Sequence, residues 1–199
     1  MRKVQAKRGH SIEDRTGEKR RFRLIRGNYP YQVTVGSVEI VAAPENRPPF
    51  EVDAVAVEED TFLVMSADRR VQDPREPLIK IMTRVIETQP KRPGSVFVRG
   101  ESPLRFLAVV HDLNEEPTWR EEWITGALEA IFQEAERRGL RSIALPFLGT
   151  LHGSLDKARF LVLLRSVLEK ITANHFKRVW LVVPRKTRSK ILKNLQAGS

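Results

Sequence analysis

The second half of the chain alternates continuously apolar runs with segments whose apolar residues recur at helical spacing. Residues 143–148 and 179–183 are nearly all apolar, which is typical of strands buried on both faces of a sheet. A helix is predicted from about residue 118 to Gly139, because glycine fits the left-handed cap that ends many helices. Its apolar face comprises Trp123, Ile124, Ala127, Leu128, Ile131 and Ala135.

A second helix is predicted after residue 153. Ser154 is a suitable N-cap, because its hydroxyl can accept a hydrogen bond from the first turn. One face of this helix carries Leu161, Leu164, Val167, Leu168 and Ile171. Strands that alternate with helices in this way predict an α/β sandwich whose sheet is covered on both faces.

The first half has shorter apolar runs, separated by turns that contain glycine and proline. Pro44, Pro48 and Pro49 mark a loop, because proline removes a backbone donor. One more helix is predicted after residue 77, from apolar residues at helical spacing: Leu78, Ile81, Met82 and Val85. The predicted strands are 21–26, 31–35, 38–42, 52–57, 61–65, 95–99 and 104–110.

These patterns divide the chain of 199 residues into three regions. Residues 1–20 are polar and without periodicity, which predicts a basic, flexible arm. Residues 21–184 contain every predicted strand and are long enough to form one α/β domain with a sizeable core. Residues 185–199 are predicted to be a basic C-terminal tail.

Composition narrows the function classes. The chain has no cysteine, which excludes disulfides and thiolate metal sites and fits a reducing, cytoplasmic compartment. Its four histidines lack the spacing of metal ligands. No apolar run approaches the roughly 20 residues of a membrane helix, and no apolar segment follows the basic N-terminus as in a signal peptide. We therefore expect no metal, cofactor or membrane partner, and the pattern does not indicate an oligomeric state.

The net charge of +10 is concentrated at the two ends. Residues 1–26 contain ten Lys/Arg and three Asp/Glu, and residues 177–199 contain seven and none, which leaves residues 27–176 with a net charge of −4. Basic ends on a mildly acidic body predict contacts with nucleic-acid phosphates, and the alternative is a pair of solubilising tails. The candidate nucleic-acid contacts are Arg20, Arg21, Arg23, Arg185, Lys186, Arg188 and Lys190.

The strongest candidate site is the turn between the strand at 143–148 and the helix after it. Glycine lets a ligand approach the backbone closely, and a helix N-terminus offers unpaired N–H groups and a positive dipole end. The turn therefore predicts a phosphate-binding site. Lys157 would add positive charge to this site, whereas the Asp156 carboxylate would repel the phosphate. We expect Gly153→Val to block this site without unfolding the protein. The alternative is a turn that binds nothing. The candidate ligand-binding residues are Gly149, Thr150, His152, Gly153 and Ser154.

Three consecutive acids, Glu58, Glu59 and Asp60, follow an apolar strand. A carboxylate can position or activate water for the hydrolysis of a glycosidic or ester bond. Glu59 and Asp60 are therefore the candidate catalytic residues if the protein is an enzyme. The alternative is a solvated loop, because consecutive acids on a strand do not share a face. His111, at the end of another strand, is expected to be a structural histidine.

Four motifs, in this order, resemble those of the macro-domain superfamily. Residues 51–60 (EVDAVAVEED) look like the family's strand VDAIVNAAN, and residues 108–111 (AVVH) look like its strand IIHAV. Residues 134–146 resemble its helix-to-strand segment, and residues 148–153 (LGTLHG) resemble its phosphate loop. The resemblance implies a three-layer α/β/α sandwich with a mixed central sheet. It also implies ADP-ribose as a ligand, held in a crevice at the strand ends.

The chain departs from the family pattern at positions tied to catalysis. Val57 and Asp60 stand where macro hydrolases carry two asparagines, and residues 63–72 lack the glycine-rich segment that surrounds the distal ribose. Residues 42–44 replace the family's GDI, whose aspartate contacts adenine. The chain is about as similar to the non-catalytic N-terminal domain of leucine aminopeptidases.

These departures favour a non-catalytic macro-like binding module. It would hold a nucleotide, an ADP-ribose-like ligand or a nucleic-acid phosphate at the Gly149 turn, and its basic termini would contact polyanions. One alternative is a hydrolase of ADP-ribose derivatives that uses Asp60 or Glu59. Another is a scaffold protein that has lost the ligand, because an α/β sandwich hosts many functions.

Overall fold

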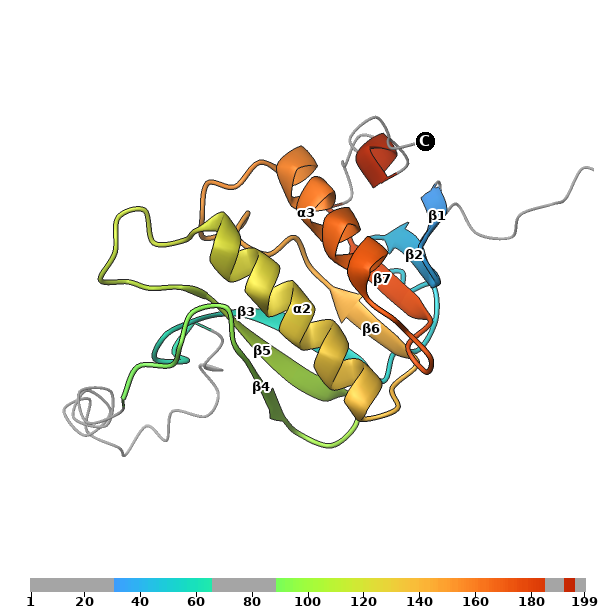
Figure 1. Cartoon of the computed structure of the whole chain (residues 1–199), viewed down its shortest axis with the longest axis horizontal. Coiled ribbons are helices and arrows are strands. Elements are labelled where there is room, and N and C mark those ends of the chain that lie inside the picture. Colours follow the sequence, from blue (N-terminus) through green and yellow to red (C-terminus); the bar gives the residue numbers. More distant parts are fainter. Residues whose placement is uncertain (1–30, 66–88, 185–191, 196–199) are drawn as a thin grey trace, which may run out of the picture.

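Seven strands form one sheet in the order β1-β2-β7-β6-β3-β5-β4 (Figure 1). The structure is a computed structural model that describes residues 31–65, 89–184 and 192–195. The strands are β1 (Tyr31–Val35), β2 (Val38–Ala43), β3 (Ala54–Asp60), β4 (Val96–Arg99), β5 (Leu104–His111), β6 (Ser142–Leu145) and β7 (Arg178–Val182). The helices are α2 (Glu121–Arg137), α3 (Lys157–Lys170) and the 3-10 turn η1 (Lys193–Leu195).

The sheet is mixed, as the resemblance implied. Strands β2, β7, β6, β3 and β5 run parallel, and the edge strands β1 and β4 pair antiparallel with their neighbours. The tight turn between β1 and β2 requires a glycine at Gly36, whose φ is +58°. Because the central strands are parallel, their carboxyl ends meet at one edge, where ligands bind in open α/β sheets.

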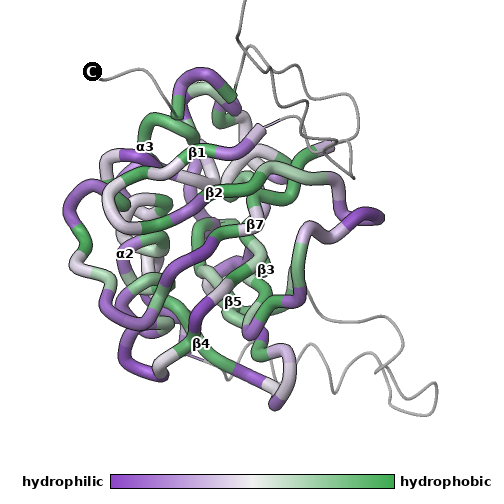
Figure 2. The backbone as a smooth tube through the Cα atoms, turned by 90° about the vertical axis from the view of Figure 1, so that its right-hand side faces the viewer, coloured by the Kyte–Doolittle hydropathy of each residue, from purple (hydrophilic) through white to green (hydrophobic). Residues whose placement is uncertain are grey.

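Helices α2 and α3 pack side by side on one face of the sheet (Figures 1 and 2). Their apolar faces join the inward strand residues in one buried cluster, which includes Ile124, Leu128, Ile131, Leu161, Leu164 and Leu168. On the opposite face Ala43, Ala144 and Trp180 are covered in part by Phe50 and Val52. The helix predicted after residue 77 lies outside the described residues, as do the strand predicted at 21–26 and residues 1–20.

The predicted end of α2 is confirmed. Gly139 has φ +67°, and its N–H donates to the Glu136 carbonyl at 3.0 Å. The N–H of Leu140 donates to the Ala135 carbonyl at 2.9 Å, which completes a Schellman motif. The helix begins at Glu121 rather than near residue 118, because the Thr118 carbonyl accepts from the Asp112 N–H in the preceding loop.

The predicted start of α3 is wrong. Asp156 is the N-cap, and its Oδ1 accepts hydrogen bonds from the N–H groups of Ala158 and Arg159 at 2.8 and 3.1 Å. Ser154 lies two residues earlier in an exposed loop, where its Oγ accepts from Trp119 Nε1 at 3.2 Å. A carboxylate is favoured at this position because it also complements the helix dipole.

Two predicted strands differ from the structure. Strand β6 ends at Leu145 rather than at Leu148, because Pro146 has no N–H to continue the ladder. Residues 61–65 form turns instead of a strand. The N–H groups of Phe62, Val64 and Met65 bond to the carboxylates of Glu59 and Asp60, and only the Thr61 N–H donates to the neighbouring strand β5, at the His111 carbonyl.

The C-terminal segment contributes to the core. Leu192 and Leu195 are 2% and 1% exposed, and η1 contacts α3. Residues 192–195, which belong to the predicted basic tail, therefore pack against the domain. Among the described residues no helix is long and apolar enough to cross a membrane.

Candidate ligand-binding cavity

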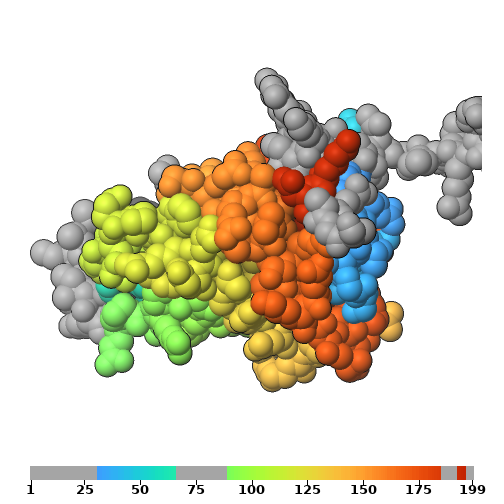
Figure 3. Space-filling model, turned by 45° about the horizontal axis from the view of Figure 1, so that its top comes forward, coloured from blue at the N-terminus to red at the C-terminus, as the bar shows by residue number. Residues whose placement is uncertain are grey.

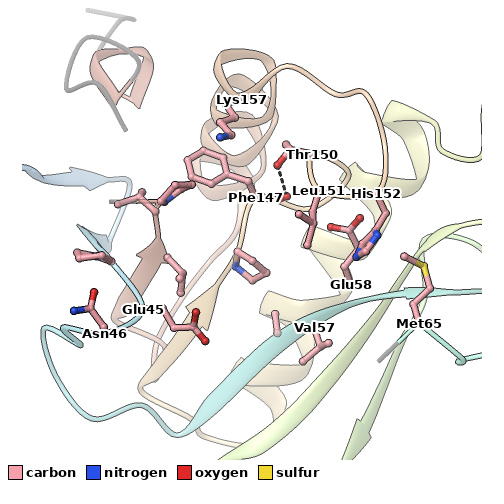
Figure 4. Close-up of a pocket in the computed structure, with 16 residues that line it drawn as sticks. Glu45, Asn46, Val57, Glu58, Met65, Phe147, Thr150, Leu151, His152 and Lys157 are labelled. Atoms are coloured by element: carbon pink, nitrogen blue, oxygen red, sulfur yellow. Dashed lines mark hydrogen bonds between the residues drawn. The ribbon is translucent and has the colours of Figure 1, made fainter. Parts of the chain in front are cut away.

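A cavity of about 670 Å³ opens at the carboxyl ends of β2, β7, β6 and β3 (Figure 4). Its volume lies within the range typical of small-molecule sites. Its lining comes from four segments of the chain, 44–46, 56–65, 146–157 and 182–184. The lining residues are Pro44, Glu45, Asn46, Ala56, Val57, Glu58, Met65, Pro146, Phe147, Thr150, Leu151, His152, Lys157, Val182, Val183 and Pro184.

The turn that follows β6 has a fixed shape. Gly149 has φ +75°, and a Cβ there would lie 2.4 Å from Ile124 Cδ1 of α2, so only glycine fits. The N–H and the hydroxyl of Thr150 both donate to the Phe147 carbonyl, at 3.2 and 3.0 Å. The Leu155 N–H donates to the Gly149 carbonyl at 3.2 Å. The turn is thus closed on itself before α3 begins.

A carboxylate from β3 lies against this turn. Glu58 Oε2 accepts a hydrogen bond from the Gly149 N–H at 3.0 Å, and Oε1 lies 2.5 Å from His111 Nε2. The two side chains are 8% and 1% exposed. The N–H that the sequence assigned to a ligand phosphate is therefore bonded to an anion of the protein itself.

His111 is a buried structural histidine, as expected. Its Nδ1 lies 3.3 Å from Thr118 Oγ1, so both ring nitrogens have partners. In the neutral ring with the proton on Nε2, the imidazole donates to Glu58 and accepts from Thr118. The His152 ring meets the His111 ring edge-on at a centroid distance of 6.3 Å. The exposed His152 and the largely covered Glu58 lie side by side at one end of the cavity (Figure 4).

The part of the turn beyond Thr150 presents backbone donors. Among the described residues, no hydrogen bond is donated by the N–H groups of Leu151, His152 or Gly153. Lys157, in the first turn of α3, places its Nζ 6.0 Å from the centre of the Phe147 ring and lines the same cavity. Adjacent N–H groups and one ammonium are the components of an anion site.

Gly153 has a different constraint from the one expected. A Cβ there would lie 2.4 Å from the Gly149 carbonyl oxygen and 2.7 Å from Trp119 Cδ1. Its φ is not among the positive values, which in this turn belong to Gly149. Gly153→Val would therefore displace the turn itself, and the expectation that it blocks a ligand while leaving the fold intact is wrong.

Glu59 and Asp60 do not line the cavity. Both are fully buried, so the alternative of a solvated loop is wrong. Asp60 Oδ1 accepts from the Phe62 N–H at 2.6 Å, and Oδ2 accepts from those of Val64 and Met65 at 3.2 and 3.0 Å. Glu59 Oε2 accepts from the Met65 N–H at 3.1 Å. These bonds hold the turn of residues 61–65, in which Leu63 has φ +58°.

The opposite end of the cavity combines apolar walls with two polar side chains. Pro44, which follows β2, and the stretch of Val182, Val183 and Pro184 at the end of β7 contribute apolar walls. Glu45 and Asn46 stand at this end, away from Glu58 (Figure 4). No group of three or more His, Asp or Glu in the described ranges could hold a metal ion.

An ion pair connects the two helices beside the cavity. Arg159 of α3 donates two hydrogen bonds to Glu121 of α2, at 2.8 and 2.7 Å. The Arg159 guanidinium lowers the pKa of Glu121 below its usual range. Because both side chains are substantially exposed, the pair adds little stability and serves mainly to align the first turns of α2 and α3. In Figure 3 the surfaces of α2 and of the segment leading into α3 lie next to each other.

The seven basic residues proposed to contact nucleic acid all lie outside the described residues. Two further cations of the C-terminal region, Lys177 and Arg178, lie at the surface of the described fold and have partners there. Lys177 donates to the Ala173 carbonyl at 3.0 Å, and Arg178 donates to Glu39 at 2.7 Å while its guanidinium stacks 4.0 Å from the centre of the Phe50 ring. Both side chains therefore make contacts within the protein itself.

Sequence reasoning did not single out Glu58 as the acid that faces the cavity. Successive side chains of a strand point to opposite faces of the sheet, so the sequence could have predicted that Glu58 and Glu59 lie on different faces. The same rule does not predict the position of Asp60, because the strand register shifts between Glu59 and Asp60. This irregularity turns Asp60 toward residues 61–65.

No protein-family model matches the chain, and no curated protein matches its sequence. Solved structures do match. A mutant of the Oceanobacillus iheyensis macrodomain, solved with ADPR, is 10% identical with a TM-score of 0.60, over 83% of this chain and 96% of that one. The macrodomain of Thermus aquaticus DarG is 22% identical with a TM-score of 0.51, over 73% of this chain and 98% of that one.

The macro domain of ganglioside induced differentiation associated protein 2 is 10% identical with a TM-score of 0.54, over 85% of this chain and 90% of that one. These likenesses, together with the mixed seven-stranded sheet, show that the chain has a macro-domain-like α/β fold. The low identities are those of a divergent sequence.

Proposed function

We propose that this protein is a binding module for an ADP-ribose-like nucleotide, which it holds in the cavity at the strand ends. One observation carries the proposal. Leu151, His152 and Lys157 line the cavity at the edge where parallel strands end, and the N–H groups of residues 151–153 donate no hydrogen bond to any described residue. Such sites bind diphosphates through backbone donors and one cation.

The two ends of the cavity suit the two ends of such a ligand. Apolar walls at Pro44, Val183 and Pro184 fit a flat base, with Asn46 and Glu45 within the same lining to meet its polar edge. The diphosphate would lie over residues 151–153, near Lys157. The group beyond the diphosphate would then reach Glu58 and His152, on the far side of the turn (Figure 4).

Isothermal titration with ADP-ribose tests the proposal. We expect saturable binding that Lys157→Ala weakens by about tenfold, since a charge-assisted contact contributes roughly 1.5 kcal/mol or more. Lys170→Ala is the matched control, because Lys170 is exposed at the opposite end of α3. Absence of binding by the wild-type protein would favour a scaffold that has lost the ligand.

We also propose that the module binds without hydrolysing. Asp60 and Glu59, the candidates for the hydrolase alternative, direct their carboxylates at backbone N–H groups and do not line the cavity. The wild-type protein is therefore expected to release no ADP-ribose from a modified protein above the uncatalysed rate. Release that Glu58→Gln abolishes would contradict this proposal, because Glu58 is the carboxylate that lines the cavity.

The basic ends support a second proposed activity, which is sequence-independent contact with nucleic acid. Affinity should fall with salt by roughly 0.9 log units per decade for each phosphate contact on duplex DNA, and by about 0.7 on single strands. Removing residues 1–20 should lower that slope. At the other end Arg185, Lys186, Arg188 and Lys190 should be replaced by glutamine rather than deleted, because a truncation after Pro184 also removes the buried Leu192 and Leu195.

Gel retardation at two salt concentrations measures both changes. Binding that persists unchanged in both variants, or no binding by the wild-type protein at low salt, would reduce the basic ends to solubilising tails.

A further inference from the structure

The carboxylate of Glu58 is a fixed feature of the cavity wall. It is the side chain of a strand residue, and its two oxygens are held from opposite sides by the Gly149 N–H and by His111 Nε2. His111 is itself fixed by Thr118 and by complete burial. Each carboxylate oxygen still has a second acceptor position after these bonds, and Glu58 is part of the cavity lining.

Glu58 lies next to the proposed diphosphate seat but beyond it. Gly149, whose N–H donates to Glu58, precedes residues 151–153 by only two to four positions in the same turn. The N–H groups of residues 151–153 donate no hydrogen bond to any described residue. Lys157 lies on the other side of Thr150, nearer Phe147 (Figure 4). A ligand that extends from the apolar end across this turn therefore presents its terminal group to Glu58 and His152, and to no described Lys or Arg of the lining at that end.

We propose that Glu58 determines which terminal group the cavity accepts: one that donates hydrogen bonds, such as a sugar with free hydroxyls, rather than a terminal phosphate. A hydroxyl can donate to the unused acceptor positions of the carboxylate, and a hydrogen bond to a charged acceptor is stronger than a neutral one. A terminal phosphate would place two like charges close together in a partly enclosed site. This inference rests on the proposed function and specifies the ligand class for it.

The variant Glu58→Gln isolates the charge of this side chain. Glutamine is close in shape to glutamate, and its carbonyl can accept from the Gly149 N–H. Its amide can donate to His111 Nε2 if the imidazole proton moves to Nδ1 and bonds to Thr118. The E58Q variant should therefore keep the turn in place. Glu45→Gln is the matched control, because it removes one negative charge from the opposite end of the same cavity. That end meets the base, which both ligands share, so the variant changes both affinities alike and leaves their ratio.

The experiment is a titration of wild type, E58Q and E45Q with two ligands, ADP-ribose and ADP. The measured quantity is the ratio of their dissociation constants, because it cancels changes common to both ligands. The wild-type protein should prefer ADP-ribose by at least tenfold. In E58Q the ratio should fall by at least fivefold, chiefly through tighter binding of ADP, whereas E45Q should leave the ratio within twofold of the wild type.

A ratio that E58Q leaves within twofold of the wild type would overturn the inference while ADP-ribose binding still supported the proposed function. Failure of every protein to bind either ligand would overturn both. Circular dichroism and thermal unfolding establish that each variant is folded. If E58Q does not fold, Glu58→Asp serves as the second variant: it keeps the charge, so it must keep the preference for ADP-ribose, and loss of that preference would contradict the inference.

Discussion

Glu58 and Asp60 stand two residues apart on β3, and their carboxylates bond to different parts of the molecule. Glu58 faces the cavity, where it accepts from Gly149 and lies beside His111. Asp60 faces away from the cavity and accepts from three N–H groups of the turn that follows the strand. In a regular strand these two side chains would share a face. The shift in register between Glu59 and Asp60 separates them.

The difference shows that acids from one short sequence cluster can have separate roles, one in stabilising the fold and one in lining the cavity. Asp60 accepts from three N–H groups of the turn at residues 61–65, so its loss is expected to appear mainly in stability. Glu58 satisfies one backbone donor and also lines the cavity, so its loss is expected to appear mainly in ligand choice.

The largest effect is expected for Asp60→Ala. The N–H groups of Phe62 and Val64 would lose their acceptor, Met65 would keep only Glu59, and Leu63 would lose the support of its left-handed conformation. We expect a loss of about 3 kcal/mol or more in the free energy of unfolding, measured by urea denaturation. A loss below about 1 kcal/mol would mean that Glu59 alone holds the turn, and the division between the two acids would be wrong.

A third carboxylate extends the comparison to the surface. Glu136 of α2 accepts from the N–H groups of Asn174, His175 and Phe176, and these hydrogen bonds, led by the one from Phe176, lower its pKa from 4.5 to about 2. A carboxylate with a lowered pKa stabilises the fold above its unfolded value, and this contribution is lost as the pH falls. We therefore expect stability to decline between about pH 4.5 and pH 2.

The variant Glu136→Gln isolates that contribution. Glu134, held by Arg137 and Arg138, has a pKa of about 2 as well and titrates in the same window. The difference between wild-type and variant unfolding curves should shrink toward pH 2 and be constant above about pH 5. A difference that does not depend on pH would show that the hydrogen bonds, and not the charge of Glu136, stabilise residues 174–176.

The smallest effect on stability is expected for Glu58→Gln, at less than about 1 kcal/mol, because glutamine can replace both hydrogen bonds. The measurement is the same urea denaturation as for Asp60→Ala. A loss as large as that of Asp60→Ala would show that Glu58 also belongs to the structural group of acids, and it would remove the contrast between the two residues.

Much of the fold was predictable because its pattern is local. The strands at 31–35, 38–43 and 178–182 and the end of α2 at Gly139 follow from apolar runs and a glycine cap. The mixed sheet came from the family resemblance rather than from periodicity. Boundaries were less accurate where another residue competed, as Asp156 did with Ser154 for the start of α3.

The site was predictable only in part. The glycine turn and Lys157 were predicted as parts of the candidate site, because both lie within one short segment of the sequence. The bond between Glu58 and Gly149 joins residues 91 positions apart, and no local pattern indicates it. The same holds for Leu192 and Leu195, whose burial depends on the packing of η1 against α3. Contacts of this kind are set by topology, which brings β3 beside β6 in the sheet.

A crystal structure of the protein with ADP-ribose tests the proposed function most directly. We expect the diphosphate within hydrogen-bond distance of the N–H groups of residues 151–153 and near Lys157, with a hydroxyl of the terminal sugar on Glu58. Ligand bound outside the cavity, or an empty cavity at saturating ADP-ribose, would contradict the proposed function. A diphosphate that displaces Glu58 from the Gly149 N–H would contradict the role assigned to Glu58.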